Sequence, residues 1–420
     1  MIKFVHMADV HLGYRQYNSD ERAIDFAQAF LRAMKFAVER RVDFVLIAGD
    51  LFHKKSEIDP LTLAQATKIL EKAKKSGIPV IAVEGNHDAT YFKEYFSWLD
   101  YLSKSGLLIN LKPRFEDGEI VVDEWDRKEG GAYVDLDGVR IYGMKYYGSL
   151  TGRILDEYSK RVKRKGFTVF MAHVGVEGHM NVYGCVNSSK LHRMNVDYVA
   201  LGHIHKGFVE GKIFNPGSLE TCDITELEFK RGFFYVEYDG ELKYELVENE
   251  RREFVLLRLN LDSPDYERIE RTIPKKDTRP VVDLTITTTR SVRNTLDEER
   301  IKRIVREKLD PVVIRLRWDI VDRRFTAKLN FENKESIERS VVEQLLKNYD
   351  YGNVVDEILR LKSIFCSNFR VDLVDGLVED ILGLKAEKVE VDKGVVEEEE
   401  VWDWRKAYVK RVTPRKRQKL

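Results

Sequence analysis

The sequence predicts an α/β fold that is followed by a smaller α/β unit and then by a helical region. Short apolar runs alternate with amphipathic helical patterns from residue 1 to about residue 245, and this alternation is typical of sheets whose faces are covered by helices. The pattern changes near residue 250 and becomes helical after Asn333. A chain of 420 residues has room for roughly two to four domains at about 100–200 residues each.

The elements of the first region follow from the spacing of apolar residues. Phe4–Ala8 is a continuous apolar run, interrupted only by His6, and it predicts a buried strand. Apolar residues in Ala23–Val38 recur on one helical face. The remaining predicted elements of this region are strands over Phe44–Ala48, Val80–Val83, Val139–Gly143, Phe167–Ala172 and Tyr198–Leu201, and a helix over Leu61–Lys75.

The second unit combines strands over Phe254–Leu259, Val281–Thr287 and Val312–Trp318 with a helix over Asp297–Leu309. Beyond it, one helical stripe contains Ile337, Val341, Val342, Leu345 and Leu346, and another contains Val374, Leu377, Val378, Ile381 and Leu382. The last 16 residues hold eight Lys or Arg and no acid, which is typical of a mobile tail. The predicted domains are therefore 1–248, 249–330, 331–385 and 386–420.

Composition excludes several classes of protein but does not indicate a substrate. Lys plus Arg and Asp plus Glu both total 71, so the net charge does not indicate a nucleic-acid partner. No apolar run reaches the ~18 residues of a membrane span, and the N-terminus predicts a first strand rather than a signal peptide. The three cysteines are far apart in the chain. We therefore expect no disulfide framework, no cysteine-based zinc site and a reducing intracellular location.

Five of the apolar runs end in residue types that bind metal ions. These are Asp9 and His11 after the first run, Asp50 and His53 after the second, Asn86, His87 and Asp88 after the third, His173 after the fourth, and His203 and His205 after the fifth. In open α/β folds, ligands bind outside the carboxyl ends of the strands. If the five strands share one sheet, these groups converge. The i, i+2 spacing would place Asp9 and His11, and likewise His203 and His205, on one side of an extended segment.

The donor set consists of carboxylate and amide oxygens and imidazole nitrogens, without thiolate. This donor set is typical of sites that bind Mn, Fe or Zn ions through oxygen and nitrogen. It is not typical of structural zinc sites, which are built from cysteines. Seven ligands from among these ten residues are too many for one ion but sufficient for two ions that share a carboxylate. Two such ions at about 3.5–4 Å can clamp a phosphate and activate a water, so the pattern predicts hydrolysis of a phosphate ester.

The ordered set D-x-H, GD-x-x-H, GNHD, a lone His after a strand, and GH-x-H over residues 1–220 resembles the calcineurin-like metallophosphoesterase family. The resemblance implies a two-sheet sandwich flanked by helices. It also implies that one ion is held by Asp9, His11 and His205, the other by Asn86, His173 and His203, and that Asp50 bridges them. His87 would lie near the scissile phosphate, oriented by Asp88, and His53 would lie beside the leaving group.

GDLFH and the NPGSLE segment at Asn215–Glu220 are similar to the DNA double-strand-break repair nucleases of the Mre/SbcD family. This resemblance implies a nuclease domain (1–248), a capping domain (249–330) and a helical region (331–385) that docks a Rad/SbcC-type SMC-like ATPase with a coiled coil. It further implies a homodimer with two Mn²⁺ per subunit. Such an enzyme would act on DNA in the cytoplasm or nucleoid as a 3'-5' exonuclease and single-strand endonuclease. The alternatives are a phosphatase or nucleotide phosphodiesterase, or a non-catalytic repair scaffold.

Several of these residues also have ordinary structural interpretations. A lone histidine such as His173 is usually a core or surface residue, and only the ordered set makes it a ligand candidate. Asp88 could instead cap a helix that begins near Thr90. His6 is expected to be buried in the first strand, and His179 and His192 are expected to have no part in the site. Two basic groups could contact DNA or simply be solvated, namely 160–165 and the arginines at 315, 317, 323 and 324.

Overall fold

A computed structural model describes residues 1–89, 96–180, 184–321, 334–346 and 354–367. The chain divides into two compact units, Met1–Val321 and Asp322–Leu420. The first unit contains both predicted α/β regions. The second contributes two described helices. The helix expected near Thr90, the stripe from Val374 to Leu382 and the charged tail fall outside the described residues.

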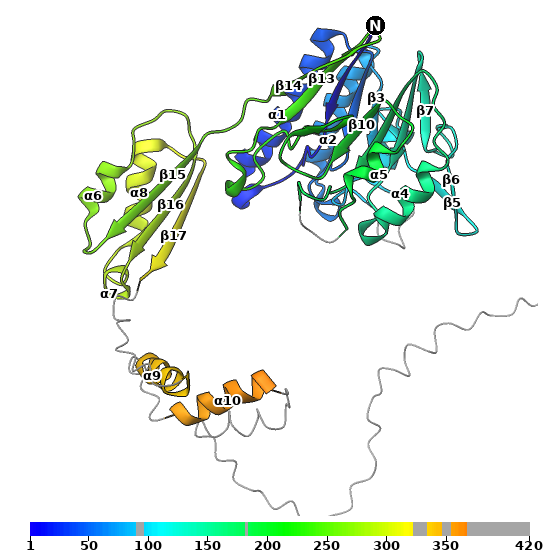
Figure 1. Ribbon diagram of the computed structural model, residues 1–420. Coiled ribbons are helices and arrows are strands. Elements are labelled where there is room, and N and C mark those ends of the chain that lie inside the picture. Colours follow the sequence, from blue (N-terminus) through cyan, green and yellow to red (C-terminus); the bar gives the residue numbers. More distant parts are fainter. Residues whose placement is uncertain (90–95, 181–183, 322–333, 347–353, 368–420) are drawn as a thin grey trace, which may run out of the picture. The chain divides into compact units, whose positions relative to one another are not determined.

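The predicted two-sheet sandwich is confirmed, and it accounts for most of the first unit (Figure 1). One six-stranded sheet has the order β14-β13-β1-β2-β3-β4, and the other has the order β11-β12-β10-β9-β8-β7. The strands of the first sheet are β14 (Leu242–Glu248), β13 (Gly232–Tyr238), β1 (Ile2–Met7), β2 (Phe44–Ala48), β3 (Val80–Val83) and β4 (Ile109–Asn110). Those of the second are β11 (Phe208–Glu210), β12 (Ile213–Asn215), β10 (Tyr198–Gly202), β9 (Phe167–His173), β8 (Val139–Met144) and β7 (Tyr133–Leu136).

The strands that precede the candidate ligands run parallel to one another. Strand β1 pairs in parallel with β2, and β2 pairs in parallel with β3. In the second sheet β9 pairs in parallel with both β8 and β10. These strands are buried along nearly their whole length, because apolar side chains cover both faces of a parallel sheet. The carboxyl ends of β1, β2 and β3 therefore lie together at one edge, and those of β9 and β10 lie together in the partner sheet.

Three apolar layers hold the sandwich together. The inner layer lies between the sheets and includes Phe4, Leu46 and Ile81 from one sheet and Val169 and Phe214 from the other. The outer face of the first sheet is covered by α1 (Asp20–Arg40), α2 (Pro60–Lys75) and α3 (Trp98–Lys104), and that of the second by α4 (Thr151–Ser159) and α5 (Ser188–His192). Figure 1 shows the two groups of helices on opposite sides of the sandwich.

Local sequence signals explain where the long helices begin and end. The Ser19 side chain accepts a hydrogen bond from the Arg22 backbone N–H and caps α1. Asp59 caps α2 in the same way, with Pro60 at the first helical position. Helix α1 ends at Arg40, and the next residue, Arg41, adopts a left-handed conformation with φ 51°. The shorter elements of this region are η1 (Gln16–Asn18), η2 (Lys55–Glu57), β5 (Arg114–Glu116), β6 (Glu119–Val121), η3 (Gly148–Leu150) and η4 (Ile224–Glu226).

The smaller α/β region has its own sheet and core. Strands β15 (Phe254–Leu261), β16 (Val281–Thr288) and β17 (Val313–Ile320) form a parallel sheet in that order. Helices α6 (Tyr266–Thr272), α7 (Arg290–Arg293) and α8 (Glu298–Leu309) accompany this sheet. Apolar residues of β15, β16 and α8, among them Leu284 and Val305, form its core. The predicted strands and the predicted helix of this region are thus confirmed to within a few residues.

The second compact unit contributes α9 (Lys334–Leu346) and α10 (Val355–Ser367). The two helices are joined by ion pairs from Arg339 to Asp356 and from Lys362 to Glu338. No helix within the described parts of the chain is long and apolar enough to cross a membrane.

Candidate metal centre

The structure brings the side chains that follow five strand ends to one place. Asp9 and Asp50 follow β1 and β2, and Asn86 follows β3 in the same sheet. His173 is the last residue of β9, and His203 follows β10, both in the second sheet. The candidate centre therefore lies where the carboxyl ends of the two sheets meet, and neither sheet supplies all of its groups.

Three of the predicted ligands form one half of the centre. The Nε2 atoms of His11 and His205 lie 3.2 Å apart. Asp9 Oδ1 lies 4.0 Å from His205 Nε2. Two imidazole nitrogens at this separation are too close to be neighbours without a shared proton or a shared cation. Because ligand bonds to divalent metals are about 2.0–2.2 Å long, atoms this far apart can bind one ion.

Three other predicted ligands form the second half. Asn86 Oδ1 lies 3.0 Å from His173 Nε2 and 2.9 Å from His203 Nδ1. The two imidazole nitrogens are 3.2 Å from each other. In this half, an amide oxygen and two ring nitrogens thus lie close enough together to bind a single ion. These donors suit a divalent ion of borderline softness.

Asp50 lies between the two halves. Its Oδ2 is 3.3 Å from His173 Nε2 on one side and 4.0 Å from His11 Nε2 on the other. Its Oδ1 accepts a hydrogen bond of 2.9 Å from the His87 backbone N–H, which holds the carboxylate in this orientation. Asp50 is 2% exposed. The position is the one that a bridging carboxylate requires.

The outer ring nitrogens of two histidines are anchored so that the inner nitrogens face the centre. His173 Nδ1 hydrogen-bonds to the Ala48 carbonyl at 2.9 Å. His205 Nδ1 hydrogen-bonds to Glu226 Oε1 at 2.7 Å. When the outer nitrogen donates its proton in this way, the inner nitrogen keeps its lone pair for a metal. The residues present therefore fit a pair of divalent cations.

The ligand segments are not extended, contrary to the simple reading of the i, i+2 spacing. Asp9, His11 and Asp50 have φ of 50°, 51° and 53°, and His203 has φ of 91°. These left-handed conformations are rare for residues with a side chain, and they occur at functional sites that the surrounding structure supports. The ligands meet because the chain turns sharply at each strand end.

One glycine lets two ligand segments approach closely. A Cβ atom built on Gly85 would lie 2.0 Å from Asp50 Oδ1. The β3 end could then not approach the β2 end, and Asp50 would be displaced. The glycine in GNHD is therefore needed for space next to the carboxylate rather than for a positive φ.

The electrostatics of the centre favour a bound cation. Burial by itself would raise the pKa of Asp50, but the nearby His173 reverses this effect and holds the Asp50 pKa far below its usual value. Burial likewise opposes protonation of His173, yet the Asp50 and Asp9 carboxylates raise its pKa to about 9. Burial lowers the pKa of His11 and brings that of His203 to about 3. The carboxylates thus favour a positive charge on His173, and a bound cation would supply positive charge at the same place.

His53 and His87 lie at the edge of the centre, and both are half-buried. The His87 Nδ1 donates a hydrogen bond to the His53 carbonyl, and His87 Nε2 lies 3.9 Å from Asp50 Oδ2. The His53 ring is stacked on Tyr14, with ring centroids 3.7 Å apart. Burial and the neighbouring His87 lower the pKa of His53 to about 4. Both histidines can face a substrate that approaches the centre.

Asp88 has a different partner from the one expected. Its carboxylate accepts hydrogen bonds from the backbone N–H groups of Leu51 and Phe52 at 2.8 and 2.9 Å, and from Gly85 at 3.4 Å. Asp88 therefore joins the loops that carry Asp50 and Asn86, whereas the His53 carbonyl holds the His87 ring. Burial and the charge of Asp50 raise the pKa of Asp88 to about 8.

Three supporting residues carry no signal in the sequence. Tyr14, Glu226 and Cys222 contact His53, His205 and the pair His11–His205, respectively. Tyr14 and Glu226 lie outside every apolar run that ends in a ligand, so strand-end reasoning could not find them.

The other histidines behave as expected. His6 is fully buried and lies 3.0 Å from both the Tyr198 hydroxyl and the Leu201 carbonyl. His179 and His192 lie outside the centre, and each is 3.2 Å from a carboxylate oxygen of Glu210.

Most of the basic side chains that sequence analysis singled out are engaged with acids. In the group at 160–165, the acidic partners of Lys160, Arg161, Arg164 and Lys165 are Glu157, Glu119, Asp197 and Asp135, respectively. Arg315 and Arg317 both bind Asp283, whereas positions 323 and 324 fall outside the described residues. These ion pairs reduce the net positive charge available for phosphate contacts.

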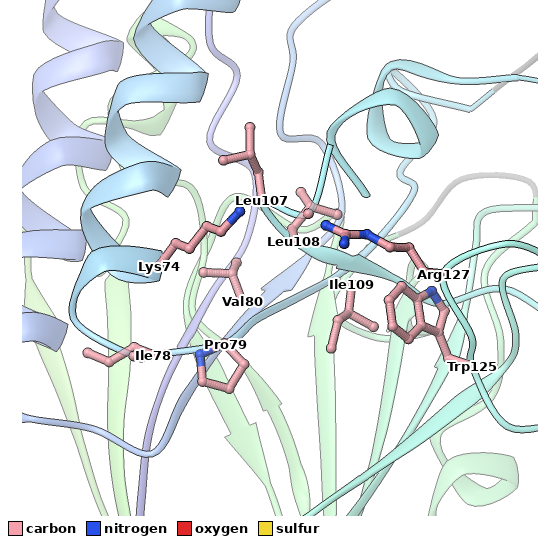
Figure 2. A pocket seen from close by; sticks show the side chains of 11 residues that line it. Lys74, Ile78, Pro79, Val80, Leu107, Leu108, Ile109, Trp125 and Arg127 are labelled. Atoms are coloured by element: carbon pink, nitrogen blue, oxygen red, sulfur yellow. The ribbon is translucent and has the colours of Figure 1, made fainter. Parts of the chain in front are cut away.

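A separate hollow of about 470 Å³ lies at the opposite ends of β3 and β4 (Figure 2). Its walls are apolar, with Ile78, Ile109 and Trp125, and the cations of Lys74 and Arg127 extend beside them. It contains no imidazole and no carboxylate among its lining residues. Because the histidines and carboxylates gather at the other end of the strands, we place the chemistry there.

Comparison with known proteins agrees with this geometry. The model of the calcineurin-like phosphoesterase family matches residues 2–207. The chain is 33% identical over 299 residues to the DNA double-strand break repair protein Mre11 of Archaeoglobus fulgidus, and the match covers 64% of each chain. It is 28% identical to the Mre11 protein of Aeropyrum pernix, over 57% of this chain and 59% of that protein. For the Mre11 protein of Methanocaldococcus jannaschii the identity is 28%, over 66% and 75%. The chain thus spans somewhat less than two thirds of the first two relatives.

Proposed function

Because residues 2–207 place the chain in the calcineurin-like phosphoesterase family, we propose that it is a two-metal phosphodiesterase that cleaves DNA at double-strand breaks. The observation that carries the proposal is the position of Asp50, whose Oδ2 lies between the nitrogens of His11 and His173. A single carboxylate between two ligand sets is what a pair of ions needs, and a pair of ions is what phosphodiester hydrolysis uses.

In this proposal the chain holds two Mn²⁺ per subunit. Asp9, His11 and His205 would hold one, Asn86, His173 and His203 the other, and Asp50 both. When bound, the ions supply an activated water and neutralise charge on the phosphate. The anchored outer nitrogens of His173 and His205 keep the inner nitrogens directed at the centre, so the ligands need little rearrangement during the reaction.

The two edge histidines would act on the substrate. His87, held through Nδ1 by the His53 carbonyl, presents Nε2 on the same side as Asp50 and would contact the scissile phosphate. His53, stacked on Tyr14, would stabilise or protonate the leaving oxygen. Asp88 would support both histidines indirectly. It binds the backbone of the loop at Leu51 and Phe52 and does not act through an imidazole ring.

DNA is the proposed substrate because the relatives are named as DNA double-strand break repair proteins. We extend the proposal to 3'-5' exonuclease and single-strand endonuclease activity, to a homodimer, and to a complex with an SMC-like ATPase in the cell interior. The region 331–385, which includes α9 and α10, would dock the ATPase, and 249–330 would form the cap over bound DNA.

The test measures cleavage of labelled linear duplex DNA with Mn²⁺. Asp50→Asn should lower the rate by about a thousandfold, because bridging-ligand loss removes several kcal/mol of transition-state stabilisation. Asp239→Asn is the matched control, since its carboxylate makes only an exposed ion pair with Lys243 at 3.9 Å. Equal rates for the two variants would contradict the proposal.

A second substrate separates the alternatives. Rapid turnover of a small phosphomonoester without cleavage of duplex ends or hairpins would favour a phosphatase or nucleotide phosphodiesterase. Failure of the protein to bind Mn²⁺ in equilibrium dialysis would favour a non-catalytic scaffold.

A deletion tests the proposed docking region. A chain lacking residues 333–420 should no longer bind the ATPase in a pull-down, yet it should keep Mn²⁺-dependent nicking of DNA.

A further inference from the structure

The hollow at the amino ends of β3 and β4 has the size and the lining of a small-molecule site (Figure 2). Its volume of about 470 Å³ lies within the roughly 300–1,000 Å³ of ligand pockets, which are mostly apolar and carry a few polar groups. Ile78, Val80 and Ile109 supply apolar walls, and Trp125 supplies a half-buried indole. The hollow therefore suits a small ligand with an apolar or aromatic body.

Two cations converge beside these apolar walls. A Cβ atom built on Gly106 would lie 1.6 Å from Arg127 Nη2 and 3.5 Å from Lys74 Nζ. The two nitrogens are therefore no more than about 5 Å apart, where like charges repel each other even in water. Figure 2 shows both cationic ends on the side of the hollow near Leu107 and Leu108. The guanidinium can lie against the backbone at 106, next to the lysine, because glycine has no side chain there.

Neither cation has an acidic partner among the residues that the structure describes. The neighbouring Lys75, by contrast, is paired with Glu71 at 3.7 Å. A lysine in the last turn of α2 is favourable for the helix, which explains Lys74 but not the arginine that faces it. An anion bound between the two cations would remove their repulsion and accept hydrogen bonds from both.

The turn that carries the indole and the guanidinium is held in place by its own backbone. The Trp125 N–H donates to the Tyr133 carbonyl at 2.7 Å, and Asp126 and Gly130 exchange two hydrogen bonds of 3.0 and 2.9 Å. The Asp126 carboxylate accepts hydrogen bonds from backbone N–H groups of the same turn, so this nearby acid is already engaged. The site therefore needs little ordering when a ligand binds, which favours affinity.

We propose that this hollow binds a small aromatic anion, whose phosphate or carboxylate group lies between Lys74 and Arg127 and whose ring packs against Trp125 and Ile109. A guanidinium can donate two parallel hydrogen bonds to such a group, and an ammonium adds a further charge-assisted one. Contact with an indole is favourable for any flat ring. The cationic end and the apolar end of the hollow thus match the two ends of one ligand.

Two sources offer this chemistry. A nucleoside monophosphate combines a flat ring with a phosphate, and cleavage of DNA would release it next to the protein. An aromatic carboxylate combines a ring with a carboxylate. The hollow lies at the opposite ends of the strands from the candidate metal centre, so ligand binding here requires no metal ion and does not depend on the proposed function.

The experiment uses the full chain labelled with 5-fluorotryptophan, because ¹⁹F NMR then reports on each indole separately. Trp125→Phe assigns the resonance, and excess chelator keeps metal ions out of the candidate metal centre. Deoxyadenosine monophosphate and 2-naphthoate are titrated separately, and at least one of them should shift the Trp125 resonance in a saturable manner. The ligand that binds identifies the source. The neutral analogues deoxyadenosine and 2-naphthamide should bind at least about tenfold more weakly, because they lack the anionic group.

Two double variants test the cations. Lys74→Ala/Arg127→Ala should weaken binding at least about tenfold, since it removes the charge-assisted hydrogen bonds. Lys68→Ala/Lys128→Ala is the matched control and should bind as the wild type does. It removes one exposed cation from the same helix and one from the same turn, and neither side chain lines the hollow. Asp50→Asn should also keep binding, and its loss there would place the ligand at the metal centre and overturn the proposal.

Other results would also overturn the proposal. These are an unchanged Trp125 resonance with both ligands, a neutral analogue that binds as tightly as its anion, or wild-type affinity in Lys74→Ala/Arg127→Ala. A Trp125 resonance that moves with protein concentration alone would do the same, since the hollow would then be an interface between copies of the chain. None of these results changes Mn²⁺-dependent cleavage of DNA, so failure of this inference is distinguishable from failure of the proposed function.

Discussion

Replacing Arg22 by methionine should destabilise the phosphoesterase domain strongly. The Arg22 guanidinium is fully buried and donates to Gln16, Asp25, Glu220 and the Thr221 carbonyl, at 2.6–3.1 Å. A methionine can fill much of the volume but can donate no hydrogen bond. The consequence depends on which acid is left without a partner.

Glu220 is the acid that would lose its ion-pair partner. Asp25 keeps Arg252, which donates to it through Nη2 at 2.6 Å. Glu220 would keep only the hydrogen bond of 2.9 Å from the Thr221 backbone N–H, and its Oε2 already has no partner among the described residues. Removing one member of a buried ion pair costs about 3–5 kcal/mol, because the other charge remains in a medium that solvates it poorly.

Calorimetry and urea denaturation measure the effect. At about 2–4 °C per kcal/mol for a domain of this size, Arg22→Met should lower Tm by on the order of 10 °C. Arg15→Met is the control: Arg15 makes exposed ion pairs with Asp20 and Asp59 at 2.7 Å, and its loss should cost less than about 1 kcal/mol.

A double variant tests the cause. Adding Glu220→Gln to Arg22→Met removes the uncompensated charge and should recover a substantial part of the lost stability, which a cycle of single and double variants measures. The reasoning would be refuted if Arg22→Met lowered the free energy of unfolding no more than Arg15→Met does. It would also be refuted if the losses caused by Glu220→Gln and Arg22→Met simply added in the double variant.

Three further predictions concern the site and the sheet. Tyr14→Leu should lower DNA cleavage about two- to tenfold, because it removes an aromatic stack on His53 worth about 0.5–1.5 kcal/mol, whereas Tyr14→Phe should keep the wild-type rate; equal rates for both variants would contradict a positioning role. Burial lowers the pKa of His6 from 6.5 to about 3, so the unfolded chain binds the proton first as pH falls. Urea unfolding should therefore show about 2 kcal/mol lost at pH 5 relative to pH 7 through this group, and His6→Gln should lack that loss if the protein folds. Chelation should lower the Tm of the wild type, with about 2.7 kcal/mol restored at metal concentrations near one hundred times Kd; a similar response of Asp50→Asn would place the bound metal elsewhere.

Much of the fold and of the candidate site can be predicted from local sequence patterns. The strand Phe44–Ala48 and the strand Val80–Val83 were predicted with the bounds that the structure has. The rule that candidate ligands follow strand ends depends only on where an apolar run stops, and Asp50 and His173 do lie at the ends of β2 and β9. Within the first sheet, the ligands that follow β1, β2 and β3 converge because these strands run parallel, as the alternating helices indicate on topological grounds.

The sequence by itself therefore determined the element types, the order of the candidate ligands and the class of chemistry, because each depends on periodicity and residue type within a few positions. Only the tertiary structure decided that two sheets rather than one supply the ligands, that Asp88 supports loops rather than the His87 ring, and that Cys222 lies beside His205. The physical reason is that these contacts join side chains from separate loops. Their meeting depends on how the sheets pack and how the backbone turns at each strand end, and no local pattern encodes that geometry.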